Sequence, residues 1–516
     1  MSISVHIGLL WDESVIRGEL ICDHLVRCRV DCCRYLTLDN TAGSFEVSGE
    51  AGRREGEYGI RLSESLSPQH AEAALMAVHE IALRYDVDIV EAGRTWESGG
   101  HTFDNRVWWP VVKLESPADT MAVLDELRGM PGADPLALAV VRLDKAVPDL
   151  PFDFRLGDFS AKVLEVWTTP LTESSCFWLY DVPIGRGFHW ERKEQLEYRG
   201  RLRLFHSGDA GLTAVNELPL ESYLESAVGS EMRSDLPPAF SQAQAIAARS
   251  TVLATAGRHH RADGFDLCND DHCQCYQGIA READAVIAPI RESSGKVLTS
   301  SFIPHPSSLR IVDARYAKAC GGVSERYEAV WGGEGPDYFA VRACGEFAAP
   351  DLSDERNARD FLENAPAAWC DGREHPYPEP WDKDPLYRWQ FAYTPSELGE
   401  LVAKKTGHVV GAVRELKVIR RGKSGRILIL DIVGEANTIR IYGELNIRRA
   451  LSPSHLPSSY FVSDLRGEHI ILSGGGWGHG VGLCQLGAAA MAKAGWSVEQ
   501  ILNHYYPGSE VTTIEG

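Results

Sequence analysis

The sequence predicts an α+β protein, because helical periodicity and strand alternation occupy separate stretches of the chain. Apolar residues recur at helical spacing in residues 67–85 and again in 220–231. They alternate instead in residues 416–441, which favours a meander of strands. A length of 516 residues suits two or three domains and is ample for a buried core.

Residues 1–150 are expected to form a separate N-terminal region. The first 60 residues read as short strands and turns, interrupted by five glycines from Gly43 to Gly59. Helices are predicted over 67–85 and 118–127. None of these motifs carries recognisable chemistry, so the role of this region stays open.

The central region, residues 151–350 with a core of 196–345, combines helices with antiparallel strands. A hairpin is predicted over 196–215, where apolar residues alternate on both sides of a glycine turn. A helix then runs through Glu231, and an Ala-rich helix follows over 241–257.

The last third divides into a β-rich segment, residues 351–470, and a C-terminal segment, residues 471–516. The β-rich segment holds most of the predicted meander and is either an insertion or a second domain. The C-terminal segment starts with a glycine loop and ends in a helix that opens with Ser497 and Gln500 as a capping box.

Charge and hydropathy exclude two classes of partner. A formal net charge of −21 disfavours a nucleic-acid backbone and an anionic membrane surface, because both require clustered Lys and Arg. No stretch reaches about 18 uninterrupted apolar residues, so no membrane span is expected. No basic segment precedes the short apolar run at the N-terminus, so no signal peptide is expected, which taken alone indicates the cytoplasm.

Glu231 is the strongest candidate for catalysis on physical grounds. It shares a helical face with Leu220, Leu224 and Val228, so its carboxyl is expected to be partly desolvated. Desolvation disfavours the charged form of a carboxyl, which suits a general acid that works near neutral pH. The alternative is a carboxylate at a helix end in a salt bridge with Arg233 or Arg249.

Residues 474–482 form a glycine-rich loop between a strand and a helix. The spacing never satisfies G-x-G-x-x-G, and no G-K-[ST] follows, which argues against a nucleotide site. Glycines at this density let a backbone approach a ligand closely, and His479 between two of them is expected to be exposed. By this pattern alone, the loop is either a structural turn or a binding loop.

Twelve cysteines are too few for a disulfide scaffold in a chain of this size, so most are expected to be reduced thiols. One cluster offers thiols and an imidazole that could ligate zinc. A disulfide within the cluster, or plain loop thiols, are the alternatives. The residues concerned are Cys268, His272 and Cys273, with Cys275 beside them and His259, His260 or Cys320 as further candidate ligands.

Three stretches of the chain together resemble the SpoIID/LytB family of cell-wall proteins. Their order and spacing argue against coincidence. The first is 218–250 with the motif Ser230-Glu231-Met232; the second joins 265–276 to Cys320-Gly321-Gly322-Val323 and Val330-Trp331-Gly332-Gly333; the third is 475–488, closing with His504-Tyr505-Tyr506-Pro507-Gly508.

The resemblance implies a lytic transglycosylase that cleaves peptidoglycan glycan strands between N-acetylmuramic acid and N-acetylglucosamine. The acid–base glutamate of the family lies in its S-E-M motif, which here contains Glu231. This residue would protonate the leaving oxygen and then act as base while the sugar's 6-hydroxyl attacks, leaving a 1,6-anhydro end. One carboxyl suffices for this route, whereas ordinary glycosidases need two.

The resemblance also implies the surroundings of the reaction. The C-terminal glycine loop would complete the glycan cleft, no cofactor would be required, and a structural zinc would lie near the cysteine cluster. The chain would act outside the cytoplasm, in the periplasm or cell wall, on glycan strands and alongside a cell-wall amidase. The implied substrate-binding residues are Tyr276, Gly478, His479, Gly480, Gln485 and Arg249, and the implied metal ligands are Cys268, His272 and Cys273.

Two other functions stay open. LytB-type members are described as amidase enhancers, so the chain could bind glycan or an amidase without catalysis. A hydrolase would need a second carboxylate, for which Asp235 and Asp266 are the candidates. The chain departs from the family pattern at Cys484, where a serine is usual, and its N-terminal third has no counterpart in the short sporulation members. Sporulation itself is not implied by these residues.

Overall fold

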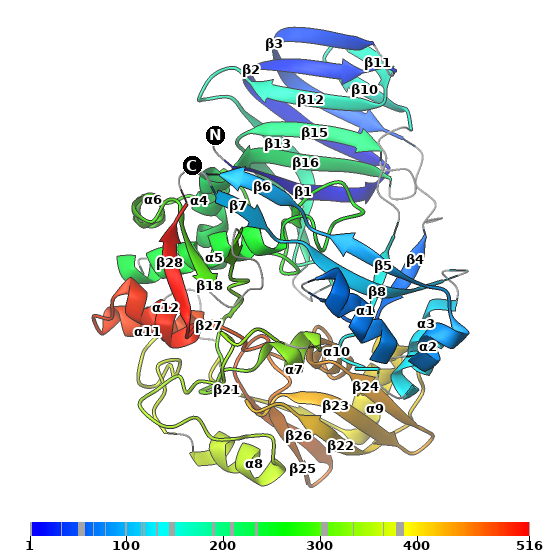
Figure 1. The fold of residues 1–516 in the computed structure, drawn as a ribbon, viewed down its shortest axis with the longest axis vertical. Coiled ribbons are helices and arrows are strands. Elements are labelled where there is room, and N and C mark those ends of the chain that lie inside the picture. The colour runs from blue at the N-terminus through cyan, green and yellow to red at the C-terminus, as the bar shows by residue number, and fades with distance from the viewer. Residues whose placement is uncertain are drawn as a thin grey trace.

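The computed structural model contains helices and strands in several sheets, which confirms the α+β class (Figure 1). The predicted helices over 67–85, 118–127, 220–231 and 241–257 are all present, as is the meander. The structure describes residues 3–31, 34–49, 57–65, 67–77, 79–98, 101–114, 116, 119–130, 133–143, 150–187, 191–206, 211–232, 236–300, 308–333, 335–364, 366–377 and 386–514.

The largest sheet joins the start of the chain to the central region. Its order is β11-β10-β3-β2-β12-β15-β16-β1-β17, and β13, which pairs with β14, attaches to β2. Because β1 pairs with β16 and β17, the boundary predicted at residue 150 falls inside a shared sheet. The strands are β1 (Ser4–Glu13), β2 (Val15–Arg29), β3 (Tyr35–Ser48), β10 (Phe152–Leu156), β11 (Phe159–Val163), β12 (Glu165–Pro170), β13 (Cys176–Ile184), β14 (Arg192–Tyr198), β15 (Arg201–His206), β16 (Leu212–Pro219) and β17 (Leu267–Cys268).

One sequence prediction is wrong in this sheet and one is confirmed in part. The chain opens with long strands rather than short ones, and register shifts interrupt the β2–β3 pair between Leu20 and Val26. The hairpin predicted over 196–215 is present as the antiparallel pair β15–β16, whereas β14, at the start of that range, pairs with β13. Alternation identified strands here, but alternation does not encode which strands pair.

Two smaller sheets contain the rest of the N-terminal region. One has the order β5-β8-β4-β9 and packs against three short helices through a small core. The other brings β6 and β7 against strands from much later in the chain, in the order β28-β18-β19-β7-β6. The elements are β4 (Tyr58–Arg61), α1 (Pro68–Ala77), α2 (His79–Arg84), β5 (Val87–Ala92), β6 (Thr95–Ser98), β7 (His101–Asp104), β8 (Val107–Lys113), α3 (Thr120–Gly129), β9 (Ala139–Arg142), β18 (Lys296–Ser300), β19 (Ser308–Ile311) and β28 (Ser509–Thr513).

The central helices pack below the large sheet (Figure 1). Helix α5 (Pro238–Thr255) is buried around nearly its whole circumference and contacts α4 (Leu220–Glu231), α6 (Asp284–Glu292), α11 (Gln485–Lys493) and α12 (Val498–Tyr505). Its many alanines let these neighbours approach closely, since a helix that is enclosed on all sides has little room for large side chains. The predicted capping box at Ser497 and Gln500 is present at the start of α12.

The β-rich segment has its own hydrophobic core, formed between two three-stranded sheets and their helices. The sheet β21-β26-β25 includes the strand that leads into the glycine loop, so this segment and the C-terminal segment are continuous. The elements are α8 (Glu355–Asn364), β21 (Arg388–Tyr393), α9 (Pro395–Thr406), β22 (Val413–Arg421), β23 (Ile427–Gly434), β24 (Thr438–Tyr442), α10 (Glu444–Ala450), β25 (Phe461–Arg466) and β26 (His469–Gly475).

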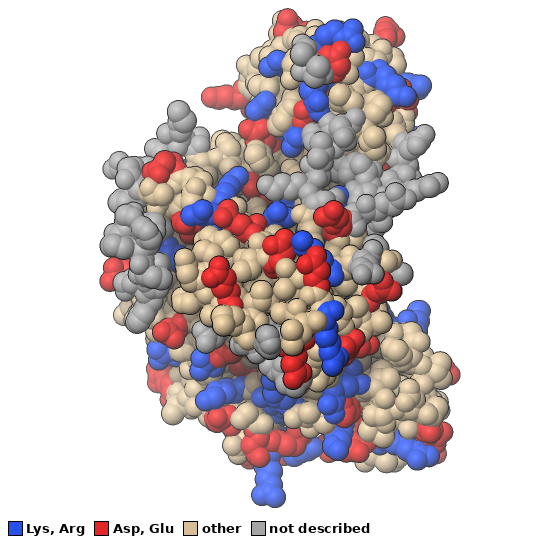
Figure 2. Space-filling view, turned by 45° about the vertical axis from the view of Figure 1, so that its right-hand side comes forward, with Lys and Arg blue, Asp and Glu red and all other residues tan. Residues whose placement is uncertain are grey.

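The surface carries charged side chains of both signs. On the face shown in Figure 2, Lys and Arg are interspersed with Asp and Glu and do not form one extended basic patch. Among the residues that the structure describes, no helix combines the length and the apolar character needed to cross a bilayer.

Candidate active site around Glu231

Glu231 is the last helical residue of α4, and its side chain is half-buried. Its Oε1 accepts a hydrogen bond of 3.0 Å from the backbone N–H of Cys275. Its backbone carbonyl accepts a hydrogen bond of 2.8 Å from Lys318 Nζ. The carboxyl is therefore oriented by a loop, and Arg249 pairs with Glu221 instead of Glu231. Arg233, the other arginine considered for a salt bridge, lies outside the described residues.

Side-chain contacts attach α4 to the loop that holds the Glu231 carboxyl. The hydroxyl of Tyr223 donates to Gln274 Oε1 at 2.9 Å, and the hydroxyl of Ser226 donates to the carbonyl of Gly278 at 2.8 Å. Gly229 lets the helix approach this loop, since a Cβ there would lie 2.1 Å from the carbonyl oxygen of Arg281. These contacts fix the end of α4, and with it the position of Glu231.

Asp271 and Lys318 are the charged side chains that interact with Glu231 electrostatically. Burial raises the pKa of Asp271, a hydrogen bond from the Cys275 thiol lowers it, and the nearby Glu231 carboxylate raises it. Burial lowers the pKa of Lys318, while Glu231 and Asp271 raise it. Asp271 is nevertheless exposed at its surface. Glu231 and Lys318 are half-buried, so this charged group is partly accessible to solvent.

Tyr316 connects this group to the glycine loop. It lies in β20 (Tyr316–Ala317), which pairs in parallel with β27 (Leu483–Cys484) at the end of the loop. A second bridge joins Ala319 to Trp477. Burial raises the pKa of Tyr316 well above its ordinary value, and the Glu231 carboxylate raises it further. The C-terminal loop is thus brought to the central region, next to β20 and the residue that follows it, Lys318.

The glycines of the loop are required by packing against the protein itself. Gly478 and Gly480 have φ of 92° and 75°, which favour glycine. A Cβ on Gly480 would lie 2.4 Å from the guanidinium of Arg426, and one on Gly482 would lie 2.0 Å from the carbonyl oxygen of Arg315. Of the two alternatives left open by the sequence, the structural turn accounts for these glycines.

His479 is half-buried at the tip of this turn. Its ring lies edge-on to Trp331 with 5.0 Å between the ring centroids. Burial, together with Arg315 and Arg426, lowers the pKa of His479 to about 3, so the imidazole is neutral at physiological pH. Because Nδ1 accepts the N–H of Val481 at 3.0 Å, the proton resides on Nε2.

Four of the predicted substrate-binding residues are buried: Gly480 packs against Arg426, and the other three serve the core. Tyr276 is 1% exposed and donates to Asn216, and Gln485 is 1% exposed at the start of α11. Arg249 is fully buried, and its guanidinium donates to both carboxylate oxygens of Glu221 and to the carbonyl of Lys296. Direct contact with a glycan is therefore not open to them in this conformation, whereas His479 and Gly478 reach the surface.

One of the two carboxylates considered for a hydrolase, Asp266, does not lie beside Glu231. Asp266 is 4% exposed and accepts hydrogen bonds from the His6 backbone and from Arg94. The other, Asp235, lies outside the described residues. The carboxylate that does interact with Glu231 is Asp271, which sequence reasoning missed although it lies inside the quoted motif. No sequence pattern singled out Lys318, because its contact with Glu231 spans 87 residues.

The predicted metal ligands Cys268, His272 and Cys273 lie together with His260. The ligand atoms of these four residues are all within 4.8 Å of one another. Two thiols and two imidazoles match the donor set of a closed, four-coordinate zinc site, so the residues present fit the metal. The three cysteines Cys268, Cys273 and Cys275 are free thiols here, and Cys275 is directed at Asp271 instead of the cluster. Cys320 belongs to a separate group of cysteines.

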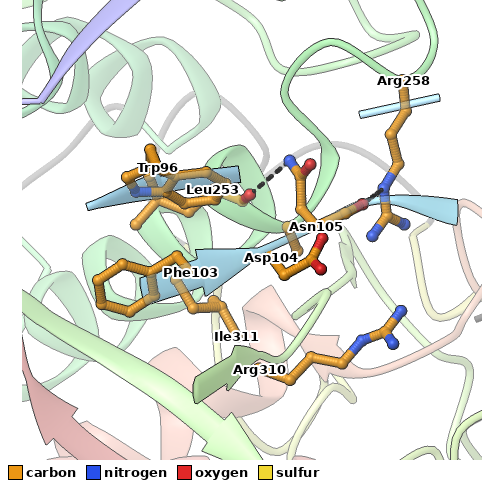
Figure 3. Close-up of a pocket in the computed structure, with 9 residues that line it drawn as sticks. Trp96, Phe103, Asp104, Asn105, Leu253, Arg258, Arg310 and Ile311 are labelled. Carbon is orange, nitrogen blue, oxygen red and sulfur yellow. Dashed lines mark hydrogen bonds between the residues drawn. The ribbon is translucent and has the colours of Figure 1, made fainter. Parts of the chain in front are cut away.

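A small pocket lies near the C-terminal end of α5, where the N-terminal region contacts this helix (Figure 3). Asn105 donates to the carbonyls of Leu253 and Ala256, which are among the last carbonyls of the helix. Arg258 donates to the carbonyl of Asn105 at 2.7 Å. The lining polar groups thus fasten the N-terminal region to α5, and Glu231 is not among the lining residues.

Two protein families match parts of the chain. Residues 208–300 match the family described as stage II sporulation protein, and residues 325–482 match a domain of unknown function (DUF8618). The first match contains Glu231, Asp271 and the cysteine–histidine cluster. The second contains the β-rich segment and most of the glycine loop.

Individual relatives agree with the first match. The chain is 23% identical to the stage II sporulation protein D of Bacillus subtilis, over 58% of this chain and 76% of that protein. It is 26% identical to an uncharacterized protein of Brachyspira hyodysenteriae, over 61% of this chain and 72% of that protein. A shorter segment is 37% identical to the amidase enhancer of Bacillus subtilis, over 13% of this chain and 10% of the enhancer.

Proposed function

Because this chain belongs to the SpoIID/LytB family, we propose that it is a peptidoglycan lytic transglycosylase with Glu231 as the acid–base residue. The family match itself supports the coarser statement of a cell-wall-related role. The finer one rests chiefly on the carboxyl of Glu231, which is oriented by the Cys275 N–H and interacts with the nearby charged side chains of Asp271 and Lys318.

The reaction needs one group that first gives and then takes a proton. Protonated Glu231 donates to the glycosidic oxygen as the bond from C1 of N-acetylmuramic acid breaks, and N-acetylglucosamine leaves with a free hydroxyl. The Glu231 carboxylate then accepts the proton of the 6-hydroxyl as its oxygen bonds to C1. No water is consumed, the product carries a 1,6-anhydro ring, and Glu231 ends protonated as it began.

The neighbours of Glu231 have separate roles in this proposal. Lys318 holds the carbonyl at the end of α4, and so positions the helix terminus. The turn with Gly478 and His479 reaches the surface and would line the glycan cleft. The His479 imidazole is engaged by the Tyr316 backbone and by the Val481 N–H, so it fixes the shape of this turn.

We also propose a structural zinc held by Cys268, His272 and Cys273, with His260 as the fourth ligand. A closed site of this kind supplies folding energy rather than catalysis. Its ligands are close in sequence to the residues that surround Glu231. Asp271 lies between the ligands Cys268 and His272, and Cys275 follows the ligand Cys273. The metal would thereby fix the loop whose N–H orients the Glu231 carboxyl.

Replacement of His272 by alanine tests this zinc. We expect the purified protein to lose one equivalent of zinc, measured by elemental analysis, and to unfold at a lower temperature. His70, an exposed histidine of α1, provides the control as His70→Ala, which should keep the wild-type zinc content. An unchanged zinc content in His272→Ala would rule out this ligand.

The rival function is a non-catalytic enhancer of a cell-wall amidase. It is favoured by the local identity to the amidase enhancer of Bacillus subtilis. In both cases the partners are extracytoplasmic, so we propose the periplasm or cell wall as the place of action.

Product analysis of purified peptidoglycan separates these functions. Wild-type protein is incubated with intact and with peptide-stripped glycan, and the fragments are analysed by mass spectrometry. We expect fragments with 1,6-anhydro ends, which weigh one water less than hydrolysis products. Fragments with reducing ends would instead indicate a hydrolase. Release of fragments only when an amidase is added would establish the enhancer.

A further inference from the structure

Four cysteines that are far apart in the sequence meet in the core beneath the glycine loop. They are Cys320, Cys344, Cys370 and Cys484, and each is at most 2% exposed. Their sulfur atoms all lie within 4.8 Å of one another. Cys320 follows β20, Cys484 ends β27, and the other two lie in the connections between α7 (Tyr327–Trp331) and β21. The group therefore joins four separate segments of backbone.

The spacing of the sulfur atoms fits one metal ion and not a disulfide. Cys320 Sγ lies 3.7 Å from Cys370 Sγ, whereas a disulfide requires about 2.05 Å. Four thiolates around zinc at about 2.3 Å form a tetrahedron with edges of about 3.8 Å. Four sulfurs so close together also leave no room for an iron–sulfur cluster, which holds its cysteines around several iron atoms.

Hydrogen-bond donors surround these sulfur atoms. The backbone N–H of Cys320 donates to Cys484 Sγ at 3.2 Å, and the hydroxyl of Tyr505 lies 3.5 Å from Cys344 Sγ. Donors of this kind stabilise metal-bound thiolates, which carry negative charge. Gly487 keeps the space beside the sulfurs clear, since a Cβ there would lie 2.5 Å from Cys344 Sγ.

Ordinary packing explains the group less well. A single buried cysteine behaves as a small hydrophobic residue, as Cys28 does in the large sheet. Four of them from four segments, each near the others, need a common ligand to account for their convergence. The same cluster explains why this chain has Cys484 where the family usually has serine, because serine would leave the set with three thiols.

We propose that Cys320, Cys344, Cys370 and Cys484 bind a structural Zn²⁺ ion. The ion connects the segment that contains β20 and Lys318 to the end of the glycine loop and the start of α11. It thereby holds Lys318 in place beside the end of the Glu231 helix. This proposal does not depend on the reaction that the protein catalyses.

The test is the metal content of the full chain and of two single variants, Cys484→Ser and Cys370→Ser. Serine matches the size of cysteine but is a poor zinc ligand. We expect each variant to contain one equivalent of zinc less than the wild type and to unfold at a lower temperature. The matched control is Cys28→Ser, which changes an equally buried cysteine outside the cluster and should keep the wild-type zinc content.

Unchanged zinc in folded Cys484→Ser would overturn the proposal, and so would iron in place of zinc in the wild type. If the cysteine variants do not fold, the His272→Ala variant provides the test. This variant lacks the cysteine–histidine zinc, so the zinc that it still contains should lie in the four-cysteine site. X-ray absorption at the zinc edge should show sulfur neighbours alone. Nitrogen or oxygen neighbours around that zinc, or the absence of zinc, would refute the site.

Discussion

Glu231→Gln is expected to lower the rate of glycan cleavage by about 10²–10⁴-fold, the range over which acid–base residues contribute. The glutamine oxygen can still accept the N–H of Cys275, so the position of the side chain is kept. The amide cannot supply a proton to the leaving oxygen or take one from the 6-hydroxyl. The rate is measured from the release of anhydro-ended fragments at saturating glycan.

The matched control is Glu225→Gln on the same helix. Glu225 forms an ion pair of 2.7 Å with Arg291, which is an exposed arginine of α6, and it makes no contact with the Glu231 loop in the described structure. We expect Glu225→Gln to cleave at the wild-type rate. If Glu231→Gln cleaves as fast as this control, Glu231 is not the acid–base residue.

Arg426→Met is expected to destabilise the protein by about 3–5 kcal/mol, the cost of breaking a buried charged network by removing one partner. Arg426 is fully buried in the β-rich segment. It donates to the carbonyl of Gly478 and to the carbonyl of Cys320, and so links the glycine loop to the strand beside Glu231. Methionine fills the volume but leaves these acceptors without their donor.

Thermal unfolding and glycan cleavage measure the two consequences of Arg426→Met. The unfolding temperature should fall, and cleavage should weaken even where the protein stays folded, because the turn with His479 loses its support. Arg414→Met serves as control, since the side chain of Arg414 is 67% exposed and its contact with Glu435 is long, at 3.6 Å. If Arg426→Met and Arg414→Met unfold at the same temperature, Arg426 does not support the turn with His479.

Local patterns were sufficient for the helices and for the residue at the centre of the site. The 3.6-residue period over 220–231 located α4, and the position of Glu231 on its apolar face agrees with a half-buried carboxyl. The capping box at Ser497 and the cluster of Cys268, His272 and Cys273 were likewise readable, because each is formed by residues close in sequence. Nearest neighbours along the chain are also neighbours in space, so spacing alone identifies them.

Contacts between distant segments were decided by the tertiary structure. Lys318 meets Glu231 across 87 residues, and Cys320 meets Cys484 across 164. The same holds for β1, which the sequence assigned to a separate region and which pairs with β16. The burial of Arg249 and Tyr276 could not be predicted from the sequence either. Their positions in the motifs suggested contact with substrate, but their side chains fill the core.

The sequence by itself thus determined the α+β class, the helix that ends at Glu231 and the resemblance of the surrounding segment to the SpoIID/LytB family, because periodicity and short motifs are local properties. Only the tertiary structure decided which strand, loop and cysteines surround that residue. Strand pairing and side-chain burial depend on the packing of the whole chain. That packing is set by contacts between residues far apart in the sequence, which local patterns do not identify.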